Sequence, residues 1–150
     1  MRTLFIGVFF VLISTSTKAQ VEGFSLGGDI VEQQISAEYT VSERVTARLD
    51  VGFEISDVSF FSFSPFLLFQ KIDNAVNIGD AGVMTPYHGP GLVIVVGDVE
   101  TVVAAEFVWG LEFDINDMPF EVFIDAGPYI QFDPTSAVAL SSSFGVRYKF

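Results

Sequence analysis

The sequence predicts an all-β protein: an eight-stranded antiparallel up-and-down transmembrane β-barrel, preceded by a cleaved signal peptide. Three observations lead to this fold class. A short apolar run near the start ends in small polar residues, and nearly every later segment alternates apolar and polar residues with a period of two. The apolar members of that alternation are mostly bulky, whereas the polar members are small or charged. Bulky residues suit a lipid-facing surface, and small or charged ones suit a narrow lumen.

The first 20 residues have the three-part layout of a secretory signal. Arg2 precedes an apolar run from Leu4 to Ile13, and Ala19 ends a small-x-small site after Thr17. The run is too short to span a membrane as a helix, which needs about 20 apolar residues. We therefore expect residues 1–20 to be a signal peptide and residues 21–150 to be the barrel.

Composition narrows the class of protein further. The chain has 150 residues, which favours one domain, and no cysteine, which excludes a disulfide framework. Its net charge of -12 excludes nucleic acid as a partner, because phosphate binding requires a basic surface. Seventeen phenylalanines in so acidic a chain are unusual for a soluble domain. They are expected if part of the phenylalanine faces lipid.

The strand pattern is clearest in the segment 45–55. Val45, Leu49 and Phe53 share one face of this segment, and Arg48 and Asp50 share the other. The eight predicted strands are residues 24–30, 34–41, 45–55, 60–72, 87–97, 104–115, 120–132 and 141–150.

The connections between these strands decide the topology. All are short except residues 73–84, so neighbouring strands form antiparallel hairpins, and eight such strands close into a small barrel. Residues 85–97 are apolar on both faces, which leaves their register open. Pro65 and Pro128 fall within strands and predict a bulge or distortion at each.

The direction of the apolar face follows from side-chain size. If it pointed inward, Phe107, Trp109, Phe113 and their counterparts would have to fit inside a narrow barrel. If it points outward, the lumen holds the small and charged face instead. Aromatic residues near strand ends are then candidates for interfacial girdles: Tyr39, Phe53, Trp109, Phe113, Phe120, Phe132, Tyr148 and Phe150.

An outward apolar face places nine acids in the lumen against three bases. The acids are Asp29, Glu38, Asp50, Glu54, Glu106, Glu112, Asp114, Glu121 and Asp125, and the bases are Arg48, Arg147 and Lys149. So many buried charges cannot all be dry, ionised and unpaired. We predict a lumen charge network of Glu38, Arg48, Asp50, Glu112, Glu121, Asp125, Arg147 and Lys149.

Strand parity predicts which of these charges meet. A three-residue connection at 42–44 places Val41 opposite Val45 and Glu38 opposite Arg48, close enough for an ion pair. The same parity places Glu121 opposite Lys149 or Arg147. The acids left without a base are then expected among Asp50, Glu54, Glu106 and Asp125.

Motifs for catalysis are missing from the sequence. The only histidine, His88, stands beside Gly and Pro, where a turn or strand-end position is expected. No nucleophile motif, phosphate loop or His/Cys metal cluster occurs. A calcium site at the acidic turns is only weakly supported, because no segment matches a calcium-binding loop. We therefore predict no catalytic residues, no cofactor and no metal site.

Three stretches of the chain resemble the small bacterial outer-membrane β-barrel family, the OmpX-like and OmpA-transmembrane-domain-like proteins. The ending FGVRYKF resembles the C-terminal strand by which the outer-membrane assembly machinery recognises its clients. GLEFDINDMPFEVFIDAGPYIQF resembles the penultimate hairpin of these barrels, and AEYTVSERVTARLDVGF resembles their second and third strands. The resemblance implies a monomer whose partners are outer-membrane lipid and the barrel assembly machinery, with an assembly signal of Phe144, Val146, Tyr148 and Phe150.

Three functions remain open from the sequence. The first is an integral outer-membrane barrel with a structural or surface-binding, adhesion-type role and no enzymatic activity. The second is a soluble secreted barrel that binds a small apolar ligand, as lipocalins do. The third is a narrow cation-preferring pore, which the acidic lumen suggests. The connections that would face outside are very short, so functions that family members place on long outer loops are not expected here.

Overall fold

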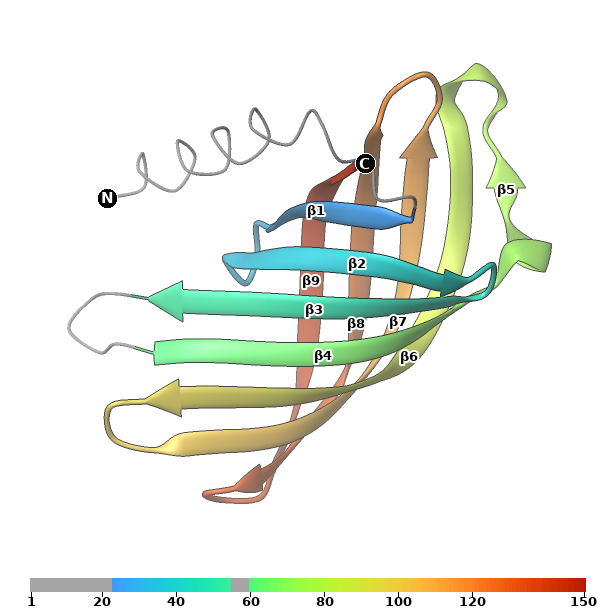
Figure 1. Cartoon of the computed structure of the whole chain (residues 1–150). Helices are drawn as coiled ribbons and strands as arrows, with labels where there is room; N and C mark the ends of the chain where they lie inside the picture. Colours follow the sequence, from blue (N-terminus) through green and yellow to red (C-terminus); the bar gives the residue numbers. More distant parts are fainter. Residues whose placement is uncertain (1–22, 55–59) are drawn as a thin grey trace.

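The chain forms a closed antiparallel barrel of eight strands, which confirms the predicted all-β up-and-down architecture (Figure 1). The structure is a computed structural model that describes residues 23–54 and 60–150. The predicted signal peptide, residues 1–20, lies outside the described residues. The wall consists of β1 (Phe24–Asp29), β2 (Gln34–Ser42), β3 (Val45–Glu54), β4 (Phe60–Gln70), β6 (Gly82–Gly97), β7 (Thr101–Ile115), β8 (Phe120–Asp133) and β9 (Ala137–Lys149).

Each strand of the wall pairs with the next one along the chain, and β1 pairs with β9 to close the ring. We call the end of the barrel that holds the first residue of β1 and the last of β9 the termini end. The turns at 43–44, 71–81 and 116–119 lie there. The turns at 30–33, 98–100 and 134–136 lie at the opposite end, which we call the far end.

The long fourth connection carries structure that the sequence pattern did not predict. It contains two single-turn 3₁₀ helices, η1 (Ile72–Asn74) and η2 (Gly79–Ala81), around the two-residue strand β5 (Val76–Asn77). β5 pairs only with the start of β6 and lies outside the ring of eight strands (Figure 1). β6 therefore begins five residues before the predicted residue 87. None of the helices among the described residues has the length and apolar character needed to cross a membrane.

The register between β2 and β3 is as predicted at its centre and differs at the turn. Glu38 lies opposite Arg48, but Ser42 rather than Val41 faces Val45. The turn is one residue tighter than expected, and Val41 forms a bulge that absorbs the difference. At the other side of the barrel, Glu121 lies opposite Arg147.

The two mid-strand prolines interrupt the hydrogen-bonded ladders without shifting the register. Pairing between β4 and β6 omits Pro65, and pairing between β7 and β8 omits Pro128, but the register is the same on both sides of each gap. A proline lacks the N–H that such a pair requires. Of the predicted bulge or distortion, the structure shows the distortion, an interrupted ladder, at both prolines and a bulge at neither. The second bulge lies instead at Phe132.

Side chains alternate between a polar lumen and an apolar outer surface. The buried polar side chains all come from one face of the wall: Ser25, Asp29, Ser36, Glu38, Thr46, Arg48, Asp50, Ser62, Ser64, Glu121, Asp125 and Arg147. Large apolar side chains on the other face are exposed, such as Phe61, Trp109 and Ile124. In β6, whose register the sequence left open, Tyr87 is buried in the lumen.

Glycines of the wall make room for the few large lumen side chains. A Cβ atom on Gly110 would lie 2.3 Å from the ring of Tyr87, and one on Gly145 would lie 2.4 Å from the ring of Phe123. Both distances are far below van der Waals contact, so a larger residue would displace the ring. The small residues of the inner face thus set where bulky groups cross the lumen.

Candidate functional site

One cluster of lumen charges surrounds Arg147 of β9. Its guanidinium Nη2 lies 2.9 Å from Oε1 of Glu38, and its Nη1 donates to Oε1 of Glu121 at 2.9 Å. Nη1 also lies 3.9 Å from Oε2 of Glu112, and Nε donates to the Ser36 hydroxyl at 3.1 Å. One fully buried cation therefore serves three carboxylates that come from three different strands.

The Arg147 side chain also packs against an aromatic ring. Its guanidinium carbon lies 3.8 Å from the centroid of the Phe123 ring, within range of a cation–π interaction. Gly27 lies opposite Arg147 in the pairing of β1 with β9, and a Cβ atom on it would lie 2.7 Å from Arg147 Cγ. The Phe123 ring restricts the guanidinium, and Gly27 leaves room for the start of the side chain, so the hydrogen bonds form without much further loss of side-chain freedom.

A second cluster is built around Arg48 of β3 in the same way. Nε of Arg48 lies 3.0 Å from Oδ2 of Asp50, and Nη1 donates to Oδ2 of Asp125 at 2.6 Å. The Tyr87 hydroxyl donates to the same Asp125 oxygen at 2.6 Å. The guanidinium carbon lies 4.3 Å from the centroid of the Phe66 ring. Each buried arginine thus combines one aromatic face with at least two carboxylates.

The third lumen base, Lys149, forms an ion pair with Asp114 near the termini end. Glu106 accepts a hydrogen bond from the Ser141 hydroxyl. Asp29, at the end of β1, accepts from the backbone N–H groups of Val31 and Glu32 at 2.7 and 3.0 Å and so holds the first turn.

Some of the expected charge pairs are exchanged. Glu38 and Arg48 lie opposite one another, but Glu38 pairs with Arg147, whereas Arg48 pairs with Asp50 and Asp125. The expectation that Asp50 and Asp125 would be left without a base is therefore wrong. The side chain of Glu54, another acid of that group, lies outside the described residues.

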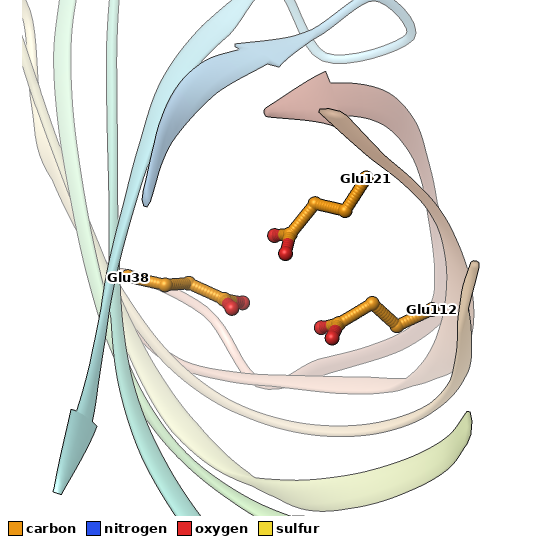
Figure 2. A group of neighbouring side chains, drawn as sticks. All are labelled: Glu38, Glu112 and Glu121. Carbon is orange, nitrogen blue, oxygen red and sulfur yellow. The ribbon is translucent and has the colours of Figure 1, made fainter. Parts of the chain in front are cut away.

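Three carboxylates of the Arg147 cluster converge on one point of the lumen. Glu38 from β2, Glu112 from β7 and Glu121 from β8 each offer an oxygen, and these oxygens lie within 4.8 Å of one another (Figure 2). Such a group has the composition of a metal site. Here, however, the Arg147 guanidinium lies within 3.9 Å of all three carboxylates, so a positive charge is already shared among them.

The lumen opens into two cavities of unequal size. A cavity of about 410 Å³ opens at the termini end and is lined by Glu38, Glu112, Asp114, Glu121 and Lys149 among others. A cavity of about 50 Å³ lies toward the far end, lined partly by Glu32, Asp50 and Glu106. The two cavities share no lining residue. Arg147, Phe123, Leu68 and Val108 are buried and line neither cavity.

The structure places the residues of the predicted assembly signal on the outer face of β9 and just beyond it. Phe144 is exposed, and Tyr148 contacts the rings of Phe120 and Phe150 with centroids 5.4 and 5.0 Å apart. The Phe150 N–H donates to the Phe24 carbonyl at 3.0 Å. The first and last strands therefore meet in an aromatic cluster at the termini end.

His88 lies in the middle of β6 rather than at a turn or strand end, which corrects the expectation for it. Its ring lies between those of Phe69 and Phe107, with both centroid distances 5.9 Å. These neighbours are apolar, and β6 turns this side chain away from the lumen charges. The contacts give His88 a packing role.

Sequence reasoning missed Tyr87, Phe66 and Phe123 as members of the lumen clusters. The segment holding Tyr87 is apolar on both faces, so alternation alone could not assign its side. Phe66 and Phe123 break the alternation of their strands. That break was the available signal, because a bulky residue on a polar face must lie over a small neighbour such as a glycine.

Comparison with known proteins gave no match to a protein-family model, to a curated protein or to a solved structure. The functional argument below therefore rests on the geometry of this chain.

Proposed function

We propose that the protein is an integral outer-membrane β-barrel with a structural or surface-binding, adhesion-type role and no enzymatic activity. One observation carries the proposal: the barrel buries its charges and exposes its hydrocarbon. The buried lumen holds Arg48, Arg147, Glu38, Asp50, Glu121 and Asp125, while the outer surface presents Phe53, Phe61, Phe63, Leu67, Trp109, Ile124, Phe132 and Leu140, each between 38% and 86% exposed.

Water would be a poor solvent for such an outer surface. Exposed apolar area costs roughly 25 cal/mol per Å² relative to burial, and soluble monomers rarely expose contiguous apolar patches larger than a few hundred Å². Hydrocarbon removes that cost, and the closed ring pairs the backbone groups of each strand wherever it overlaps its neighbours. The outer-membrane interpretation therefore accounts for both faces of the wall at once.

Strand length and aromatic placement support the same interpretation. A tilted strand needs about 9–11 residues to cross a membrane. β2, β3 and β4 have 9, 10 and 11 residues, and β6, β7, β8 and β9 have 16, 15, 14 and 13, whereas β1 has six. Phe24, Phe120, Tyr148 and Phe150 gather at the termini end, where an interfacial aromatic girdle is expected. The short outer turns favour a compact surface contact over a long binding loop.

The soluble lipocalin-like alternative requires an apolar interior. The larger cavity of this barrel is instead lined by Glu38, Glu112, Asp114 and Glu121, which suits water or cations better than an apolar ligand. The cation-preferring pore draws support from these same acids. Against it, Arg147 and Phe123 are buried in ring-to-guanidinium contact, and Arg147 bonds Glu38 and Glu121, which line that cavity.

Cell fractionation tests the proposal. The expressed full chain should be recovered from the detergent-extracted outer membrane, and its unheated band should migrate differently from the boiled band on a denaturing gel. Recovery from the soluble periplasmic fraction would support the lipocalin-like alternative. Stepwise conductance of the purified protein in planar bilayers would support the pore.

The proposed assembly partner can be tested on the last strand. Deleting Phe150 should lower insertion into the outer membrane of cells, because the resemblance makes this residue part of the recognition signal. The finished barrel should lose little stability, since the Phe24–Phe150 contact is one of several at that end. Unchanged insertion in cells would contradict this role.

A further inference from the structure

The barrel wall is incomplete at the far end, between β1 and β9. β1 has six residues and β9 has thirteen, and they pair only over Ser25–Asp29 and residues 145–149. One further bond joins the Ile30 N–H to the Phe144 carbonyl. Residues 137–143 of β9 therefore pair with β8 on one side and, among the described residues, with no strand on the other. We call residues 137–143 the open edge.

Three residues of the open edge have backbone N–H and C=O groups that face away from β8. The Phe144 carbonyl bonds on the β1 side, and the Lys149 N–H bonds to Pro119 on the β8 side. Backbone groups alternate in direction along a strand. The N–H and C=O groups of Val138, Leu140 and Ser142 therefore face outward from the edge, ready to pair with an added strand.

The chemistry of this edge differs from that of protected edges. Its sequence, AVALSSS, holds no charge and no proline, although native edges are usually blocked by lysine, proline or a covering segment. Val138 is 77% exposed and Leu140 is 86% exposed. An extended partner strand would thus find free hydrogen-bonding groups with apolar side chains beside them.

Acidic groups surround the open edge. Ser141 and Ser143 of the edge line the 50 Å³ cavity together with Glu32, Asp50 and Glu106. Arg48 is the one base among its lining residues, and it is already bonded to Asp50 and Asp125. Asp133 ends β8 beside the edge, and the turn at 134–136 that joins β8 to β9 contains no Lys or Arg. A partner side chain that enters from the edge meets the carboxyl groups of Glu32 and Glu106, which accept hydrogen bonds from Gln34 and Ser141 and form no ion pair among the described residues.

A second copy of this chain fits the edge poorly. Strands of membrane barrels tilt by about 35–45°, so two barrels standing side by side would present their edges crossed at about 70–90°. Each copy would also bring the same acidic rim to the contact. This step rests on the proposed membrane function, and a flexible peptide is not subject to either limit.

We propose that the open edge binds an extended basic segment of a partner protein, which adds to β9 as a strand. The backbone of the segment pairs with Val138, Leu140 and Ser142, and its outward side chains lie beside Leu140. One inward Lys or Arg side chain enters the cavity of about 50 Å³ between Glu32 and Glu106. A segment of about seven residues, ~24 Å long, matches the edge. Strand addition supplies affinity, and the basic side chain supplies selectivity.

The test uses the refolded full-length mature chain in zwitterionic detergent micelles. The probe is a seven-residue peptide of alternating Lys and Val, blocked at both ends and fluorescently labelled. Binding is followed by anisotropy, and amide hydrogen exchange is followed by NMR. The peptide should bind saturably and slow exchange at Val138, Leu140 and Ser142. A Glu/Val peptide, and a Lys/Val peptide with alternate amides N-methylated, should bind at least tenfold more weakly.

Variants separate strand pairing from charge. Leu140→Pro removes an edge-facing N–H without removing a bond to β8, and it should weaken binding more than Leu140→Ala does. Glu32→Gln and Glu106→Gln should each weaken binding roughly twofold to fivefold. Glu43→Gln, at a turn of the termini end, should leave binding unchanged and serves as the matched control.

Three results would overturn the inference. Equal binding of the N-methylated peptide would show attraction to charge without strand addition. Edge amides that become protected in phosphatidylcholine vesicles without peptide would show that lipid covers the edge. A dimer cross-linked through residues 137–143 would show that a second copy does. Heat-modifiable migration, measured on the same samples, reports separately on the proposed membrane function.

Discussion

The inner and outer faces of a single strand obey opposite rules in this protein. In β8, Glu121 and Asp125 point inward and are 3% and 4% exposed, while Ile124 between them points outward and is 54% exposed. The comparison teaches that the wall turns its apolar side chains outward and that its charged side chains are held by pairing inside.

The lumen combines charge pairing with a small apolar cluster of Phe66, Leu68, Tyr87 and Val108. The largest fully buried side chain is an arginine, Arg147, and the two lumen arginines each stack on a phenylalanine ring. Buried ion pairs are costly to form but far more costly to break, because the partner left behind keeps an uncompensated charge. The inner face should therefore tolerate mutation less well than its polar composition suggests.

Replacing Arg147 with Met should produce the largest effect on stability. The change leaves Glu38, Glu112 and Glu121 without their shared cation, at a cost of about 3–5 kcal/mol in the free energy of unfolding. Arg147→Lys should cost less, because it keeps the charge and loses only the forked hydrogen bonds. Urea unfolding of the refolded barrel in lipid vesicles measures both.

The control for this prediction is an exposed pair of similar geometry. Arg44 bonds Asp73 through two nitrogens at 2.9 and 3.0 Å, but both side chains are largely in water. Arg44→Met should cost no more than about 1 kcal/mol. If the two arginine substitutions cost the same, the lumen is wetter and less dependent on its ion pairs than we infer.

A charge placed on the outer face should produce the next largest effect. Ile124→Arg puts a cation on the wall between Leu111 and Phe144, and in a bilayer it should cost about 2–4 kcal/mol. Val99→Arg, at a far-end turn where the side chain is 90% exposed, should cost almost nothing. Equal and small effects of the two substitutions in vesicles would mean that Ile124 faces water.

Much of this contrast could be predicted from the sequence, because strand alternation depends only on the chemistry of neighbouring residues. The alternation of residues 45–55 predicted that Arg48 and Asp50 point inward. The requirement that both strands keep their polar faces on one side predicted that Glu38 lies opposite Arg48. What parity could not provide was the choice of ion-pair partner. That choice depends on reach across the lumen, where Arg48 meets Asp125 of β8 and Arg147 meets Glu38 of β2.

Other features failed for physical reasons that can be named. The bulge at Val41 depends on the geometry of a tight turn, to which alternation is blind. The sequence could not predict that Tyr87 faces the lumen, because β6 is apolar on both faces. The ring fits inside because Gly110, which lies opposite it, has no side chain. The open edge of β9 exists because β1 is short, and no local sequence pattern predicted the length of β1.

The pH dependence of the far end should be the smallest effect. Partial burial raises the pKa of Glu32 from 4.5 to about 7, and the nearby carboxylates of Glu106 and Asp29 add to the shift. The folded chain then binds more protons than the unfolded chain in this window, so the free energy of unfolding should fall as pH rises from about 4.5 to about 7. Glu32→Gln should flatten that slope, which urea unfolding at a series of pH values measures. An unchanged slope would place the titration elsewhere.

The single tryptophan offers the most direct test of the inside-out wall. Trp109 is 58% exposed on the outer face of β7, beside the ring of Phe107, and no other tryptophan contributes to the fluorescence. In vesicles of lipids brominated along the acyl chain, the account predicts strong quenching of Trp109 and a blue-shifted emission, with little quenching by aqueous acrylamide. Efficient acrylamide quenching without quenching by brominated lipid would place the outer face in water and contradict the membrane barrel.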